Sequence, residues 1–120
     1  DPMQVVWHGN YTRYLEQARW ELMDAIGYNL YEMRESGHLW PIVDLRIRYV
    51  RPLRLGQNIA VAASIVEFEN RLKIDYRIRD RETREVLTKA TTVQVAVLAA
   101  TGELCLECPP ALTERLRATS

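Results

Sequence analysis

The sequence predicts an α+β fold in which one long central helix is wrapped by a curved antiparallel sheet. Near the start of the chain, apolar residues recur every three or four positions from Tyr11 to Ile26, which is the period of one helix face. Four later segments are apolar or alternate between apolar and polar residues, as strands of a sheet do. Long antiparallel strands curl through their right-handed twist. Only the first helix is long and apolar enough to cover them, so we expect the sheet to wrap around it.

The predicted long helix has recognisable ends. Asn10 stands where an N-cap residue belongs, because its side chain can accept a hydrogen bond from an N–H of the first turn. Gly27 stands at the C′ position, where glycine adopts the left-handed conformation without steric cost. A shorter helix is expected around Leu30–Met33, and we expect it to end near Gly37.

The strands follow the helices as a meander. The four expected strands are residues 43–49, 59–68, 72–79 and 86–98. The second and third are predicted to form a hairpin through residues 69–71, and the fourth has a nearly continuous apolar centre that places it in the middle of the sheet. Arginines that alternate along the strands are expected to pair with acids across the sheet. After Pro109-Pro110, a C-terminal helix is predicted near residues 111–117.

The composition is typical of one globular domain. Of the 120 residues, 48% are hydrophobic and 27% are charged, so we expect residues 1–120 to form a single domain. Sixteen basic and sixteen acidic residues cancel, which argues against a nucleic-acid partner. No apolar run approaches the roughly 20 residues that span a bilayer, and no signal peptide is visible. These features predict a cytoplasmic protein without a membrane span.

Several motifs along the chain resemble those of one enzyme family when they are taken together. They are Asp1-Pro2, residues 5–11 (VVWHGNY), residues 18–21 (ARWE), residues 41–55 and residues 90–97. They resemble the N-terminal signature D-x-D-x-x-G-x-V-[YW]-[HF]-x-N-Y, the A-R-x-E element, and the second and last strands of the 4-hydroxybenzoyl-CoA thioesterase-like family. The resemblance covers nearly the whole chain. It implies the hotdog fold and acyl-CoA thioesterase activity.

The sequence departs from the family pattern in two places. The family's first strand and first signature acid are missing ahead of Asp1, so we expect that strand to precede the sequence. The signature glycine, three residues after the catalytic acid, is replaced by Gln4. A larger side chain at this position could alter the loop and the entry of substrate.

The resemblance assigns the catalytic carboxylate to Asp1. Thioester hydrolysis needs a group that attacks the carbonyl or activates water, and donors that stabilise the oxyanion. A carboxylate can act as nucleophile or as general base, and both roles stay open. The resemblance assigns the oxyanion donors to the backbone N–H groups of His8 and Gly9, at the start of the long helix. From the residues alone, Asp1 could equally be a turn residue before proline.

Substrate-binding residues are expected in two groups. Basic side chains suit the phosphates of coenzyme A. Arg71 is the first candidate, and the further candidates are Lys73, Arg51, Arg54 and Lys89, although each is more simply a solvated strand charge. Trp7, Tyr11 and Trp40 are candidates for the acyl pocket, although aromatic residues more often belong to a core or an interface. Trp40 is favoured, because members of the similar family place substrate near this strand start.

No metal or cofactor is expected, since CoA is part of the substrate. Cys105 and Cys108 form a C-x-x-C pair, but zinc usually needs four such ligands, and the chain has only two histidines, far off in sequence. A redox C-x-x-C would open a helix in a thioredoxin-like unit, which this is not. We therefore predict two free thiols.

Three functions were compared. The favoured one is an acyl-CoA thioesterase that forms a homodimer or homotetramer, because hotdog proteins pair their sheets edge to edge and place the active site at the subunit interface. Its substrate could also be carried by an acyl-carrier protein. A hotdog hydratase is discounted, because its D-x-N-P-[LIV]-H motif is absent. The alternative from another class is a non-catalytic module that binds acyl-CoA or acyl-carrier protein, which Gln4 keeps open.

Overall fold

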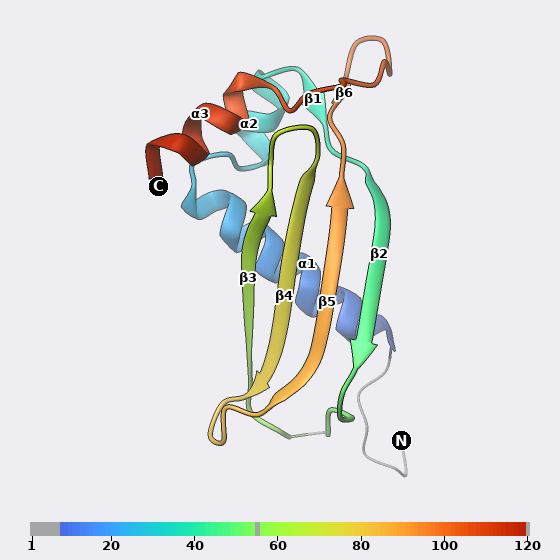
Figure 1. The fold of residues 1–120 in the computed structure, drawn as a ribbon, viewed down its shortest axis with the longest axis vertical. Coiled ribbons are helices and arrows are strands. Elements are labelled where there is room, and N and C mark those ends of the chain that lie inside the picture. The colour runs from blue at the N-terminus through green and yellow to red at the C-terminus, as the bar shows by residue number, and fades with distance from the viewer. Residues whose placement is uncertain (1–7, 55, 120) are drawn as a thin grey trace.

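The computed structural model describes residues 8–54 and 56–119, and a long helix lies across its four-stranded antiparallel sheet (Figure 1). In chain order the elements are α1 (His8–Ala25), α2 (Leu30–Glu35), β1 (His38–Leu39), β2 (Ile42–Tyr49), β3 (Ile59–Glu67), β4 (Leu72–Asp80), β5 (Val86–Gln94), β6 (Val97–Leu98) and α3 (Pro110–Thr119). The predicted α+β architecture is confirmed.

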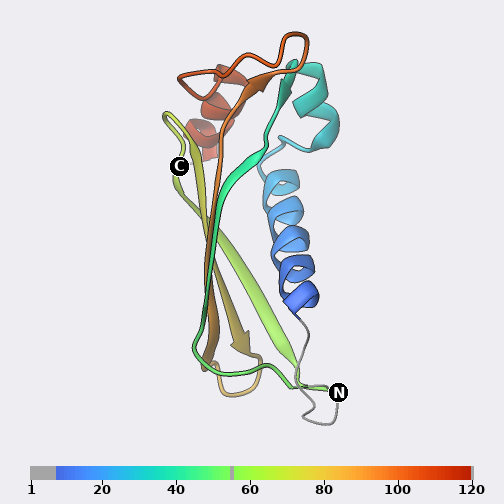
Figure 2. The ribbon, with the colours of Figure 1, turned by 90° about the vertical axis from the view of Figure 1, so that its right-hand side faces the viewer.

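The four long strands are antiparallel and are ordered β2-β5-β4-β3. As predicted, β3 and β4 form a hairpin, and β5 lies inside the sheet between β2 and β4. Seen from the side, α1 forms a second layer against one face of the sheet (Figure 2). The short strands β1 and β6 pair with each other as a separate two-stranded sheet.

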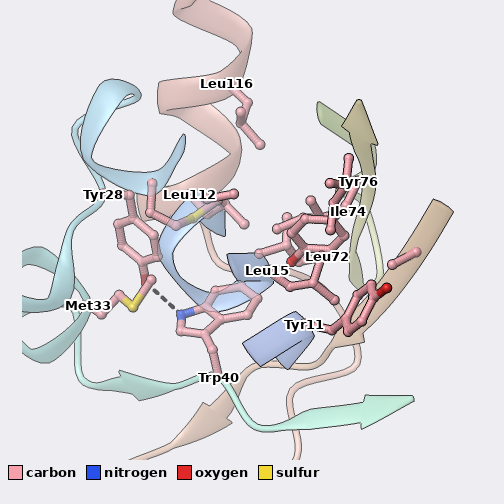
Figure 3. Close-up of a cluster of buried hydrophobic side chains, with 14 of the residues drawn as sticks. Tyr11, Leu15, Tyr28, Met33, Trp40, Leu72, Ile74, Tyr76, Leu112 and Leu116 are labelled. Atoms are coloured by element: carbon pink, nitrogen blue, oxygen red, sulfur yellow. Dashed lines mark hydrogen bonds between the residues drawn. The ribbon is translucent and has the colours of Figure 1, made fainter. Parts of the chain in front are cut away.

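The two faces of the sheet have different chemistry because side chains alternate along each strand. On the face toward α1, Ile74, Tyr76 and Ile78 of β4 are fully buried. Arg77 lies between Tyr76 and Ile78 on β4, so its side chain is on the opposite face of the sheet. It is paired with Lys89 of β5. The buried side chains join those of α1 in one core (Figure 3).

The end of α1 follows the prediction, and its beginning does not. Gly27 has a φ of +80°. Its N–H donates to Asp24 O at 3.0 Å and the N–H of Tyr28 donates to Met23 O at 2.9 Å, which is the Schellman pattern at a helix C-terminus. His8, Gly9 and Asn10 are all helical, so Asn10 lies inside α1 and is not its N-cap.

Two further expectations are corrected. The predicted strand 86–98 is interrupted at residues 95–96, because the chain changes partner there: β5 pairs with β2, whereas β6 pairs with β1. In addition, α1 is not alone in covering the core. Leu112 and Leu116 of α3 are also buried in it, so the C-terminal helix closes the end of the sheet near the β3–β4 hairpin.

Candidate functional site

The predicted catalytic end of the chain is the start of α1. His8 and Gly9 are the first two residues of the described part of α1, and the first four N–H groups of an α-helix have no partner within the helix. These are the backbone donors that the sequence analysis assigned to the oxyanion. Asp1 and Trp7 lie outside the described residues, so the structure leaves their assignments as predictions.

Tyr11 fixes the first turns of α1 against the sheet. Its ring is buried and meets the Tyr49 ring edge-on, with centroids 4.8 Å apart. The Tyr11 hydroxyl accepts a hydrogen bond from the backbone N–H of Leu53 at 3.3 Å. Burial raises the pKa of Tyr49, and Tyr11 adds to the increase. Tyr11 therefore ties the helix start to the end of β2, as a core residue with an engaged hydroxyl.

An apolar cavity of about 260 Å³ lies toward the other end of α1. Its walls come from the C-terminal half of α1, from α2, and from the segment that leads into β2. The lining residues are Arg19, Trp20, Met23, Leu30, Met33, Arg34, His38, Leu39, Trp40, Ile42 and Gln94. Trp40, the favoured pocket residue of the sequence analysis, is therefore part of a cavity wall. The cavity, at about 260 Å³, is larger than an engineered apolar cavity of roughly 150 Å³ that binds benzene.

A chain of hydrogen bonds holds one wall of this cavity. The Trp40 Nε1–H donates to the Tyr28 hydroxyl at 3.1 Å, a contact drawn in Figure 3. Tyr28 Oη lies 2.8 Å from Ser36 Oγ, and the Ser36 hydroxyl donates to the carbonyl of Met33 at 2.8 Å. The ring nitrogen Nδ1 of His38 lies 3.2 Å from the same Ser36 Oγ. The network joins Tyr28, before α2, and Ser36, at the end of α2, to His38 of β1 and to Trp40, which follows β1.

Gln94, at the end of β5, is the most deeply buried polar residue of the cavity wall. Its Nε2 donates to the backbone carbonyl of Trp40 at 2.9 Å. Its Oε1 is buried and has no hydrogen-bond partner among the residues that the structure describes. Gln94 was not among the site residues expected from the sequence. Its signal was a lone amide at the end of an apolar strand, and only the fold brings it to Trp40.

The expected phosphate-binding residues lie at the other end of the sheet from the start of α1. Arg71, in the β3–β4 turn, pairs with Glu67 through a contact of 2.8 Å. Lys73 is the second residue of β4, which has nine residues and so extends about 30 Å. Within one protomer the structure therefore does not bring Arg71 and Lys73 together with His8.

A row of like charges lies on the outer face of the sheet, and only its Lys89 was among the expected phosphate-binding candidates. Arg48, Lys89 and Arg77 stand side by side on β2, β5 and β4, where like charges repel. They line a recess of about 270 Å³ together with Arg46 and Asp75. The expectation of cross-sheet pairing with acids is wrong for this row, because the register places the bases opposite one another.

The two cysteines are free thiols, as predicted. Burial is the main reason that the pKa of Cys108 rises to about 11, and Glu69, Glu67 and Cys105 add to it. A thiol with this pKa stays protonated at neutral pH and is a poor nucleophile. Within residues 8–54 and 56–119, no group of three or more His, Cys, Asp or Glu side chains is placed to hold a metal ion.

The fold and the site together define a class of protein. A long helix that crosses one face of a curved antiparallel sheet, with its N-terminus at one end and an apolar cavity at the other, is the hotdog fold of thioester hydrolases. The sequence profile of the Thioesterase-like superfamily matches residues 1–116. The chain belongs to this family, and the expected enzyme class, a thioester hydrolase, is confirmed.

Relatives and solved structures agree with this assignment. A Synechocystis protein named as an esterase, sll0410, is 34% identical over 93% of this chain and 68% of its own length. A Bacillus subtilis protein named as an acyl-CoA thioesterase, YneP, is 33% identical over 81% of this chain and 70% of its own. The structure of the DHNA-CoA thioesterase from Staphylococcus aureus superposes with a TM-score of 0.84, with 23% identity, over 99% of this chain and 81% of that one.

In the described part of the chain, none of the helices has the length and apolar character that crossing a membrane requires.

Proposed function

We propose that this protein hydrolyses the thioester of an acyl-CoA to the free acid and CoA. The proposal is supported by the match to the Thioesterase-like superfamily and by the place of His8 and Gly9 at the N-terminal end of the described part of α1. The free N–H groups of a helix N-terminus and the positive end of its dipole suit a developing oxyanion.

In the proposed reaction, the Asp1 carboxylate attacks the thioester carbonyl or removes a proton from the water that does so. The carbonyl oxygen gains negative charge and accepts hydrogen bonds from the N–H groups of His8 and Gly9. The C–S bond then breaks, and the CoA thiolate leaves and takes up a proton. Direct attack gives an Asp1 anhydride that water hydrolyses, whereas general-base attack gives the acid in one step.

The proposed acyl pocket is the cavity beside Trp40, and its position favours a site shared by two subunits. At a helical rise of about 1.5 Å per residue, Arg19 and Met23 lie about 16 and 22 Å along α1 from His8. An acyl group compact enough to fill about 260 Å³ does not extend from a carbonyl at His8 to the cavity of the same protomer. A second protomer brings another cavity.

The β2 edge suits such a pairing. Val43 and Leu45 are 58% and 43% exposed, and β2 has a strand neighbour on one side only among the described strands. Antiparallel pairing of two β2 edges places the Ile42 end of one strand beside the Tyr49 end of the other. Ile42 lines the cavity, and Tyr49 packs on Tyr11 near the start of α1. The cavity of one subunit then faces the catalytic end of its partner.

The CoA phosphates have two proposed positions. Arg71 and Lys73 remain candidates, and the row of Arg48, Lys89 and Arg77 is the other, since clustered guanidinium and ammonium groups bind phosphate well. Replacing Lys89 by Glu and, separately, Lys73 by Glu distinguishes them. The variant whose KM for acyl-CoA rises while kcat is retained identifies the phosphate-binding group.

The primary experiment measures thiol release from a panel of acyl-CoAs by the wild type and by Asp1→Asn. We expect turnover of at least one member and its loss in the variant. Acyl-CoA binding without turnover would instead support the binding module, with Gln4→Gly as the next variant. Running the same acyl groups on an acyl-carrier protein identifies the carrier.

A mixing experiment tests the shared site. We expect Asp1→Asn and a cavity-blocking variant, Met23→Trp, to be inactive alone and to regain activity when mixed. In a mixed dimer, one of the two sites receives both an intact Asp1 and an intact cavity. If mixing restores nothing although mixed dimers form, each site belongs to a single protomer.

A further inference from the structure

We propose that Arg115 is a positioning residue for the acyl cavity, although it belongs to α3, which supplies none of the described residues that line the cavity. Arg115 holds α2 and Tyr28 from outside, and these in turn support the wall that contains Met33 and Trp40. The inference deepens the proposed function, on which its catalytic readout rests. It is carried by the contacts that Arg115 makes with neighbouring helices.

Arg115 lies where the three helices meet. Its Nη2 donates to Glu32 Oε2 of α2 at 3.0 Å, and its Nη1 donates to the carbonyl of Ala111, one turn earlier in α3. A Cβ placed on Gly27, just after α1, would lie 3.8 Å from Arg115 Nε. The positive charge is therefore also close to the C-terminus of α1, where the helix dipole favours a cation.

The contact with Tyr28 connects Arg115 to the cavity wall. The guanidinium carbon of Arg115 lies 5.4 Å from the centroid of the Tyr28 ring, a distance at which a cation is attracted to an aromatic ring. Tyr28 is fully buried. Its hydroxyl accepts from Trp40 Nε1 at 3.1 Å, and the two rings meet edge-on with centroids 6.0 Å apart (Figure 3). Tyr28 thus contacts both Arg115 and a residue that lines the cavity.

The short helix α2 needs such an anchor. It has six residues, and a helix of this length is not stable by itself, so its position depends on tertiary contacts. Three of its residues line the cavity, namely Leu30, Met33 and Arg34. Glu32 is not among them, and its carboxylate is the group that pairs with Arg115. Arg115 therefore holds α2 through a side chain that does not line the cavity.

Arg117, further along the same helix, makes the same kinds of contact away from the cavity. Its Nη2 lies 3.2 Å from Glu69 Oε2, and its guanidinium carbon lies 6.0 Å from the centroid of the Phe68 ring. Neither Glu69 nor Phe68 is among the residues that line the cavity. Arg117 is therefore a matched control, since both arginines join α3 to an acid and a ring, but only Arg115 is linked to the cavity wall.

The kinetic test compares Arg115→Met with Arg117→Met in thiol release from the acyl-CoA panel. Methionine keeps an unbranched apolar side chain and removes the charge. For the best substrate, we expect Arg115→Met to raise KM about fivefold or more and to leave kcat within about twofold, because a displaced wall weakens binding of the acyl group without changing the reacting groups. Arg117→Met should match the wild type. Arg115→Lys, which retains a cation beside Tyr28, should recover most of the loss.

A second set of measurements does not depend on catalysis. Hydrogen exchange of the amides of residues 28–36 should be about tenfold faster in Arg115→Met than in the wild type or in Arg117→Met. Octanoate and benzoate are titrated in parallel, with tryptophan fluorescence as the signal, because Trp20 and Trp40 line the cavity. If the wild type hydrolyses no thioester, the proposed function fails, and weaker binding of these acids by Arg115→Met alone still supports the inference.

Three results overturn the inference. The first is a folded Arg115→Met variant with the KM and the acid affinity of the wild type. The second is an equal loss in Arg117→Met, which would mean that α3 only stabilises the fold. The third is a wild type that binds neither the acids nor any acyl-CoA.

If Arg115→Met does not fold, Glu32→Gln replaces it, because this change removes the ion pair from the α2 side. It should raise KM in the same direction by a smaller factor. An unchanged KM and an unchanged acid affinity in Glu32→Gln would then overturn the inference.

Discussion

Strands β4 and β2 carry the same alternating pattern in sequence and have opposite environments in the structure. Ile74 of β4 and Leu45 of β2 belong to one row of the sheet, since both flank Thr92 of β5. Ile74 is fully buried, whereas Leu45 is 43% exposed. β4 has strand neighbours on both sides, and β2 is an outer strand of the described sheet. Alternation thus reports which side chains share a face, and the position of the strand decides whether that face is covered.

The difference assigns separate roles to the two strands. The apolar side chains of β4, such as Ile74, are buried in the core beneath α1. The apolar side chains of β2, such as Leu45, lie on an outer strand of the described sheet and stay partly exposed. We infer that these exposed apolar side chains of β2 contact the second protomer of the proposed dimer. The predictions below test this division from the largest expected effect to the smallest.

Ile74→Ala should destabilise the protein by about 2–5 kcal/mol, because it removes a buried side chain and leaves a cavity beneath α1. Urea unfolding monitored by circular dichroism measures the change. A loss below about 1 kcal/mol would mean that the β4 row is not the centre of the core.

Leu45→Ala should have a small effect on the unfolding of the monomer and a large effect on association. If two β2 edges pair, each dimer loses two partly buried leucines, and the dimer dissociation constant should rise at least tenfold. Sedimentation equilibrium measures it, with Val66→Ala on β3 as the control for another exposed strand residue. An unchanged dissociation constant would remove β2 from the interface.

Tyr76→Phe should cost about 1–3 kcal/mol, because its hydroxyl and that of Thr92 bond at 2.8 Å in the core and the Thr92 hydroxyl would lose its partner. The double variant with Thr92→Val should recover much of this loss, since both partners are then apolar. Thermal and urea unfolding of the single and double variants test the coupling. Additive losses would contradict it.

The turn that ends β4 should make the smallest contribution, and one that depends on pH. The backbone N–H of Thr83, the Gln57 side chain and the N–H of Glu82 donate to the Asp80 carboxylate and lower its pKa below the ordinary 3.8. The unfolded carboxyl protonates first as pH falls. The stabilising effect is therefore complete above the ordinary pKa and is lost as pH falls through the lowered one.

Asp80→Asn should lower the melting temperature slightly at pH 7 and flatten its acid dependence below pH 4. Melting curves between pH 2 and pH 7 provide the measurement, with exposed Glu103 →Gln as the control for a lost surface charge. Parallel curves for the wild type and Asp80→Asn would show that this turn carries no pH-dependent stability.

The candidate site was only partly predictable from the sequence. Trp40 was expected to line a pocket from its place just before a predicted strand, and it lies in the wall of the cavity. Gln94 and His38 were not, because their relation to Trp40 arises from the pairing of segments that are distant in sequence. The charge row of Arg48, Lys89 and Arg77 likewise depends on register, which alternation alone does not specify.

The sequence by itself determined the local elements: a long amphipathic helix that ends at Gly27, four strands with one apolar face, and a C-terminal helix. Periodicity and backbone preference act over a few residues, so they can be recognised without the fold. The tertiary structure decided the rest. It placed Asn10 inside α1, divided the last strand where its partner changes, and buried β4 while leaving β2 at an edge. These outcomes depend on contacts between distant segments, and no local pattern contains them.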